Sequence, residues 1–216
     1  MRFKDFIFGK DAALDPVKLV RDNCQQFLRL GVDQPLYRGE TNRWFEEPVV
    51  LMSVRKDRKP RDTEQHIHAL MDDWFDKKCG VRLRPEALFC SSSPDIATQY
   101  GPLHYVFPAG SFRYFWAAGI EGIEPKYENR PLKDTLVLSG WIKDRTRVKP
   151  ALMAPEITDS ILSRVKWKTG GLAQALEDEV EIAVVCDKAV MVTEKLVEKK
   201  YGSYQDFLKL VRRQDK

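Results

Sequence analysis

The chain has 216 residues, the length of one domain, and 43% of them are hydrophobic, which is enough to bury a sizeable core. The formal net charge is only +4, with 36 Lys and Arg against 32 Asp and Glu, and the two signs are interspersed. This small excess does not require a nucleic-acid partner. One basic cluster stands out within seven residues: Arg55, Lys56, Arg58, Lys59 and Arg61.

Other totals exclude several classes of protein. The four cysteines are scattered and form no C-x-x-C pair, which favours a reduced, cytoplasmic protein with buried thiols over a disulfide scaffold or a zinc site. His66 and His68 lie two residues apart on an expected helix and point to different faces, so we expect no metal site. No apolar run has the length of a signal peptide or of a membrane span, so we expect no membrane contact.

The first half of the chain alternates helical and extended patterns. A helix is predicted over about residues 15–30, with Asp15 as N-cap, Pro16 in the first turn and Gly31 after its end. "QPLYRGE" predicts a strand, and "VVLMSVR" predicts a second one. After the basic loop, "TEQHIHALMDDWFDKKCG" predicts a helix capped by Thr63 and ended by Gly80.

The pattern then becomes richer in strands. Residues 87–90 predict a short strand, followed by a serine–proline turn and a helical turn over 95–100. "LHYVFPAG" predicts a strand, and the aromatic residues of "SFRYFWAAGI" favour core packing over a base-stacking platform. From 119 to 155 the pattern is irregular, with "TLVLSGWI" as its clearest apolar stretch, and "ITDSILSRVKW" predicts a helix.

The C-terminal part predicts a short helix in "GGLAQALEDE", a buried central strand in "VEIAVVCDKAVMV", and a helix over about 203–213. Ser203 and Asp206 have the spacing of a capping box at the start of that helix. Helices and strands mix without a regular βαβ rhythm, which predicts one α+β domain over 1–216. Neither G-x-G-x-x-G nor G-x-x-x-x-G-K-[ST] occurs, so the usual phosphate-binding loops are absent.

Three segments, "PLYRG", "RLRPEALFCSSSPDIATQYG" and "EDEVEIAVV", resemble in their order and spacing the arginine–serine–glutamate class of the ADP-ribosyltransferase superfamily. The likeness is to its small bacterial and phage members and covers about residues 35–192. It implies a split, twisted β-sheet core with flanking helices. It also implies a cytoplasmic enzyme, in the host cytoplasm if a phage encodes it. Such an enzyme moves ADP-ribose from NAD, its co-substrate, to a protein, DNA or RNA acceptor and releases nicotinamide without a metal.

The resemblance also implies catalytic roles. Glu181 would stabilise the oxocarbenium-like transition state at the ribose, and Glu179, on the same face of a regular strand, would help to choose or activate the acceptor. The serine motif reads C-S-S-S instead of S-T-S, so the orienting serine is Ser91, with Ser92 as the alternative. Cys90 is expected to be inert, because no base is visible beside it.

The resemblance also implies residues that bind NAD. Arg38 would bind a phosphate group, because its forked guanidinium can contact two phosphate oxygens at once and lysine cannot. Gly39 would let backbone or ligand approach closely, and Tyr100 would stack near the nicotinamide.

Structural readings of the same residues stay open. Arg38 can be an edge-strand arginine, the serines can simply form a turn, and Tyr100 can be a packing residue. A second hypothesis is a binding protein of the same fold that has lost the chemistry and grips a protein or nucleic acid through its basic loop.

Overall fold

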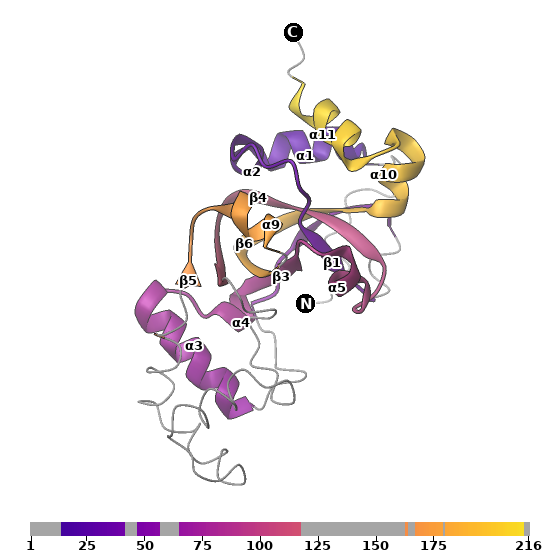
Figure 1. Cartoon of the computed structure of the whole chain (residues 1–216). Coiled ribbons are helices and arrows are strands. Elements are labelled where there is room, and N and C mark those ends of the chain that lie inside the picture. The colour runs from indigo at the N-terminus through magenta and orange to yellow at the C-terminus, as the bar shows by residue number, and fades with distance from the viewer. Residues whose placement is uncertain are drawn as a thin grey trace, which may run out of the picture.

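The computed structural model describes residues 14–41, 47–56, 65–117, 163, 167–178 and 180–213. Within these ranges the protein is a mixed α+β structure built around a small closed barrel of four antiparallel strands (Figure 1). The barrel strands run in the order β6-β3-β1-β4, and β4 pairs again with β6. Their bounds are β1 Tyr37–Gly39, β3 Ala87–Ser91, β4 Leu103–Ala117 and β6 Glu181–Thr193. The α+β class predicted from the sequence is confirmed.

Two further strands extend the sheet on its outside. β2 (Val49–Ser53) pairs with β6, and β5 (Trp167–Lys168) pairs with the end of β4. β6 therefore has β2, β3 and β4 as partners, and most of its side chains are buried. This arrangement confirms the buried central strand predicted from its apolar run.

β4 is one strand of 15 residues, although the sequence suggested two separate stretches. Its pairing with β6 shifts register between Ala109 and Phe112, where Gly110 has a φ of +67°. Such a bulge bends the strand and lets it follow the barrel wall. Phe112, Phe115 and Trp116, beyond the bulge, are buried, as expected for core residues.

The N-terminal helical region forms two helices, α1 (Pro16–Asn23) and α2 (Gln25–Arg29). Asp15 caps α1, as predicted, by accepting a hydrogen bond from the Val17 amide. The prediction of a single helix over 15–30 is wrong at Cys24, whose φ of −112° and ψ of 30° leave the helical region. The Cys24 side chain is fully buried and its Sγ lies 3.4 Å from the Phe107 carbonyl oxygen, so the interruption falls where the chain packs onto β4.

The other helices lie at the two ends and the side of the barrel (Figure 1). α10 and α11 lie with α1 over one end, α3 and α4 lie toward the other, and α5 lies beside β1. The bounds are α3 Gln65–Cys79, α4 Leu83–Glu86, α5 Pro94–Thr98, α9 Leu172–Glu177, α10 Glu194–Tyr201 and α11 Tyr204–Arg212. α3, α5, α9 and α11 match sequence predictions, whereas α4 and α10 were not predicted.

The helix caps show why these boundaries hold. Ser203 Oγ accepts from the Asp206 amide at 3.1 Å and donates to the Asp206 carboxylate at 2.8 Å, so this pair does cap α11. Thr193 caps α10 in the same way by accepting from the Leu196 amide. Thr63, "TLVLSGWI" and most of "ITDSILSRVKW" lie outside the described residues.

Two hydrophobic clusters flank the strands. The larger one joins α1, α2, α10 and α11 to one side of the strands, and the smaller one packs α3 against the other. All four cysteines are free thiols, with Cys24, Cys90 and Cys186 buried, as the sequence predicted. Among the described helices, none combines the length and hydropathy that crossing a membrane would need.

Candidate functional site

Three predicted site residues come from three neighbouring strands. Ser91, the last residue of β3, has Glu181, the first residue of β6, as its Cα partner on one side. On its other side the partner is Tyr37 of β1, and Arg38 follows directly. Adjacent strands lie about 4.8 Å apart, so Arg38 and Glu181 belong to strands separated by about 10 Å, with Ser91 between them. The fold thus brings together residues that are 143 positions apart in the chain.

The Arg38 side chain is largely buried and contacts groups of the protein itself. One terminal nitrogen of its guanidinium donates to the Phe89 carbonyl oxygen of β3 at 2.7 Å. The other terminal nitrogen lies 3.3 Å from the Glu40 carboxylate, and the side chains of Arg38 and Glu40 are 18% and 20% exposed. Arg38 Nε is buried and has no hydrogen-bond partner among the residues that the structure describes. The side chain is therefore a partly buried, incompletely satisfied cation, which differs from an edge-strand arginine extended into solvent.

Position 39 requires a glycine because the backbone of α5 comes very close to it. A Cβ atom at this position would lie 1.8 Å from the Ala97 carbonyl oxygen of α5. Gly101, with a φ of +135°, faces the same junction, and a Cβ there would lie 2.7 Å from the carbonyl carbon of Glu40. The two glycines thus let the end of β1 and the end of α5 pack in direct contact. Of the two uses expected for Gly39, the structure shows the approach of backbone.

The serines of the C-S-S-S segment differ in their contacts. Ser91 is buried, and its Oγ accepts a hydrogen bond from the Ser93 amide at 3.0 Å, which forms the turn expected before Pro94. Ser92 Oγ is buried, and none of the described residues forms a hydrogen bond with it. Ser91 is the serine paired with Glu181, and the choice between Ser91 and Ser92 as the orienting serine stays a prediction. As directly opposite residues, Ser91 and Glu181 have Cβ atoms about 5 Å apart on one face.

The remaining predicted residues have different outcomes. Glu181 is half-buried at the start of β6. Glu179 lies outside the described residues, so its position relative to Glu181 stays a prediction. Tyr100 is 52% exposed at the end of the α5 turn, so it does not belong to the buried core. Cys90 is buried on β3, as expected for an inert thiol.

Two residues beside Arg38 were not singled out from the sequence. Glu40, in the same "PLYRGE" segment, contacts the guanidinium, and its position two residues after Arg38 on an extended chain was a usable signal. His104 of β4 is the Cα partner of Arg38 and is almost completely buried. Burial lowers the pKa of His104, opposed by its hydrogen bond to the Pro102 carbonyl oxygen and by the charge of Glu40. The net direction favours the neutral imidazole of His104 beside the Arg38–Glu40 pair. Only the strand pairing could have placed it there.

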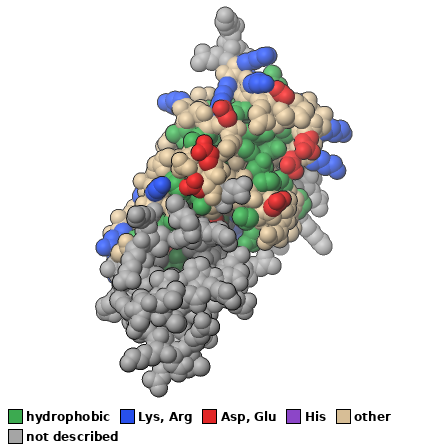
Figure 2. Space-filling view, viewed as in Figure 1, with side chains coloured by type: hydrophobic (Ala, Val, Ile, Leu, Met, Phe, Trp, Pro, Cys, Tyr) green, Lys and Arg blue, Asp and Glu red, His purple; other side chains and the backbone are tan. Residues whose placement is uncertain are grey.

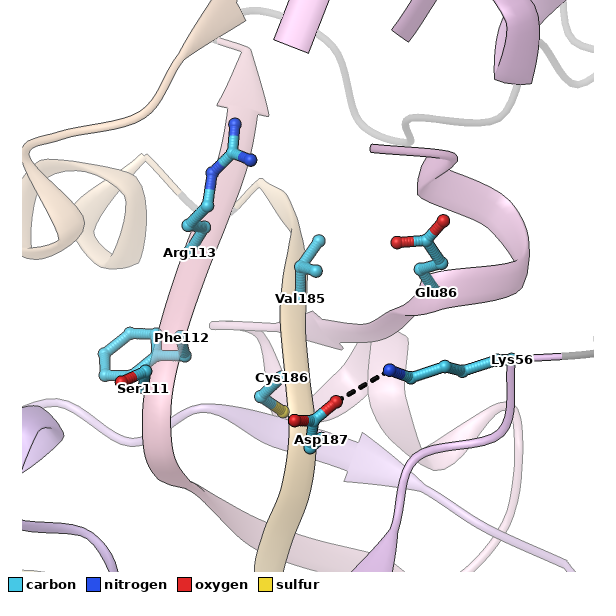
Figure 3. Close-up of a pocket in the computed structure, with 8 residues that line it drawn as sticks. All are labelled: Lys56, Glu86, Ser111, Phe112, Arg113, Val185, Cys186 and Asp187. Carbon is cyan, nitrogen blue, oxygen red and sulfur yellow. Dashed lines mark hydrogen bonds and ion pairs between the residues drawn. The ribbon is translucent and has the colours of Figure 1, made fainter. Parts of the chain in front are cut away.

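A surface cavity of about 230 Å³ lies elsewhere, beside the bulge of β4 (Figure 3). Cys186 in its floor is five residues from Glu181 along β6, or about 17 Å in an extended strand. The Lys56 ammonium and the Asp187 carboxylate form an ion pair of 2.7 Å at one side, while Arg113 extends along β4 away from them. The lining residues are Lys56, Glu86, Ser111, Phe112, Arg113, Val185, Cys186 and Asp187, none of which was a predicted site residue.

The surface charges are mixed on the face seen in Figure 2. Lys and Arg side chains stand mostly toward the rim, and Asp and Glu side chains border the hydrophobic surface between the elements. Of the basic cluster, Arg55 and Lys56 are described, and Lys56 is paired with Asp187. Arg58, Lys59 and Arg61 lie outside the described residues, so the proposed basic grip stays a prediction. No group of His, Cys, Asp and Glu in the described part of the chain is arranged to hold a metal ion.

The chain was compared with protein-family models, with curated proteins and with solved structures. None of the three comparisons found a match.

Proposed function

We propose that the protein is an NAD-dependent mono-ADP-ribosyltransferase, and that its barrel is the core of an ADP-ribosyltransferase-like fold. The observation that supports this function is that Arg38, Ser91 and Glu181 lie on the neighbouring strands β1, β3 and β6. Ser91 is the Cα partner of Glu181 on one side and of Tyr37, the residue before Arg38, on the other. These are the three residues whose motifs resemble that family. Nothing in the chain order of the motifs obliges their strands to be neighbours, so the adjacency is an independent argument for one site.

The proposed reaction begins at the bond between C1′ of the nicotinamide ribose and the nitrogen of the nicotinamide ring. That bond breaks, its electron pair leaves with nicotinamide, and positive charge develops on the ribose. The Glu181 carboxylate stabilises this charge and accepts a hydrogen bond from a ribose hydroxyl. The acceptor then forms the new bond to C1′ and loses its proton. Ser91 keeps the Glu181 carboxylate oriented, since the two residues lie directly opposite each other.

The polar groups at and beside Arg38, Ser91 and Glu181 are suited to binding a dinucleotide. Arg38 has five N–H donors. Within the described part of the chain only the Phe89 carbonyl and the Glu40 carboxylate accept from it, and Nε is buried without a partner there. A buried donor left unsatisfied is costly, so a phosphate oxygen that engages the guanidinium would recover free energy. The Ser92 hydroxyl, directly after the end of β3, is a second buried group with no hydrogen-bond partner among the described residues. Exposed Tyr100 supplies an aromatic face on which a planar ring can stack.

The test is incubation with NAD labelled in the adenylate part, with and without bacterial protein and nucleic-acid fractions as acceptors. The wild type should release nicotinamide and label an acceptor, while Glu181→Ala should do neither and should still bind NAD. Absence of transfer, of NAD hydrolysis and of NAD binding in the wild type would refute the proposed function. Salt-sensitive binding of nucleic acid without NAD binding would instead support the non-catalytic alternative.

A further inference from the structure

The contact between Arg38 and Glu40 has a consequence for the proposed phosphate site. We infer that Glu40 sets the affinity of Arg38 for phosphate, because the Glu40 carboxylate occupies the place on the guanidinium that a phosphate group would take. This inference rests on the proposed function only for the identity of the ligand, NAD. The effect of Glu40 applies to any ligand that carries a diphosphate group.

The two contacts of the guanidinium have different strengths. The bond to the Phe89 carbonyl is 2.7 Å long, which is short for a charge-assisted hydrogen bond. The contact with Glu40 is 3.3 Å and involves one oxygen, so it lacks the two parallel bonds of the best arginine–carboxylate pairs. The Phe89 carbonyl therefore fixes the position of the guanidinium, and the Glu40 carboxylate is the partner that an arriving anion can displace.

The backbone around Glu40 allows this exchange without a change of fold. The Glu40 amide donates to the Pro102 carbonyl oxygen at 3.2 Å, and Gly101 packs against the Glu40 carbonyl group. The backbone position is thus fixed, so a displacement of the carboxylate requires only a rotation of the Glu40 side chain. That side chain is 20% exposed, so part of it already reaches water.

Electrostatics give the direction of the effect. A diphosphate at Arg38 meets a second negatively charged group, the Glu40 carboxylate, and competes with it for the guanidinium. Burial to about four fifths leaves this pair less screened by salt than a surface pair. Replacing the carboxylate by an amide of the same shape removes the repulsion and keeps a hydrogen-bond acceptor for Arg38. Glu40→Gln should therefore bind diphosphates more tightly than the wild type.

The experiment is calorimetric titration of wild type, Glu40→Gln and Arg38→Lys with inorganic pyrophosphate, ADP-ribose and NAD. Glu40→Gln should lower the Kd for all three ligands by about threefold to tenfold, in keeping with the loss of one partly buried ion pair. Arg38→Lys should raise the Kd by at least about tenfold, because lysine lacks the fork. Asp22→Asn is the matched control: it removes an equal charge from an exposed pair with Lys18 on α1 and should leave the Kd unchanged.

Two further readouts separate the outcomes. Thermal melting of each variant shows whether it is folded, and Glu40→Asp, which keeps the charge, should bind no more tightly than the wild type. Equal or weaker binding by folded Glu40→Gln overturns the inference. If wild type binds pyrophosphate and ADP-ribose but neither binds nor consumes NAD, the proposed function fails while the role of Glu40 stands. If neither wild type nor Glu40→Gln binds any of the three ligands, the inference fails as well.

Discussion

Ser91 and Glu181 are Cα partners across β3 and β6, each at the terminal residue of its strand. The pairing explains why a serine ends one apolar strand and a carboxylate begins the other. The two strand ends meet at one edge of the barrel, where polar groups can be satisfied by each other or by a ligand. The same pairing connects, through Tyr37, to Arg38 on β1.

The negative charge of Glu181 should be needed for turnover of NAD. Glu181→Gln keeps the shape of the side chain and removes the charge that would oppose the developing positive charge on the ribose. We expect kcat for NAD consumption to fall by about 100-fold or more, with NAD affinity almost unchanged. Nicotinamide release and NAD titration measure the two quantities. Glu177→Gln, on exposed α9 surface, is the charge-matched control. Equal turnover by Glu181→Gln and wild type would remove Glu181 from the catalytic role.

The two serines should respond in opposite directions. Ser91→Ala loses the hydrogen bond to the Ser93 amide and should lower the free energy of unfolding by about 1 kcal/mol. It should also lower kcat by about tenfold, because Glu181 loses its orienting neighbour. Ser92→Ala removes a buried hydroxyl without a partner, so stability should stay equal or rise by up to about 1 kcal/mol. Urea denaturation and NAD turnover measure both effects; greater damage from Ser92→Ala would reverse the assignment.

Local signals in the sequence predicted most elements correctly. Asp15 and Ser203 mark helix starts, and the apolar run of β6 marks a strand with neighbours on both sides. These predictions succeeded because each depends on contacts within a few residues or on the average burial of a segment. The break of the N-terminal helix was missed, because it depends on the packing of Cys24 against β4, 83 residues away.

The closure of the barrel and the neighbours of Arg38 needed long-range information. The order β2-β6-β3-β1-β4-β5 places strands from both halves of the chain side by side. A single sequence contains no measure of which strands pair, so His104 could not be placed opposite Arg38. Glu40 was within reach of sequence reasoning, but an arginine two residues from a glutamate is common in exposed strands. Its meaning appears only with the burial of both side chains.

The junction of β1 with α5 should not tolerate a methyl group at Gly39. Its Cβ would lie 1.8 Å from a backbone oxygen, which no side-chain rotation can relieve. Gly39→Ala should lower the free energy of unfolding by about 3 kcal/mol or more. Gly170→Ala is the matched control, because a Cβ there meets nothing within 4 Å and Gly170 is not among the glycines with positive φ. It should change stability by less than about 0.5 kcal/mol. Chemical denaturation monitored by tryptophan fluorescence compares the two; equal effects would contradict the close approach.

Stability should fall in alkaline solution because of two buried thiols. Burial raises the pKa of Cys24 and of Cys186 to about 12, from a model-compound value of 9.0. Since the folded-state pKa is the higher one, the contribution of each thiol to stability is complete below about pH 9. It is lost as the pH rises from about 9 to about 12, where the unfolded chain releases protons that the folded chain retains.

The prediction is tested by the slope of the free energy of unfolding against pH. Each thiol should reduce the free energy of unfolding by up to about 1.4 kcal/mol per pH unit within that window. Urea denaturation at several pH values from 8 to about 11.5 gives the slope for the wild type and for the Cys24→Ala/Cys186→Ala double variant. The double variant should be less stable at pH 8, because it loses buried volume, but its stability should fall less steeply with pH. A slope equal to that of the wild type would show that these thiols titrate alike in the folded and unfolded chain.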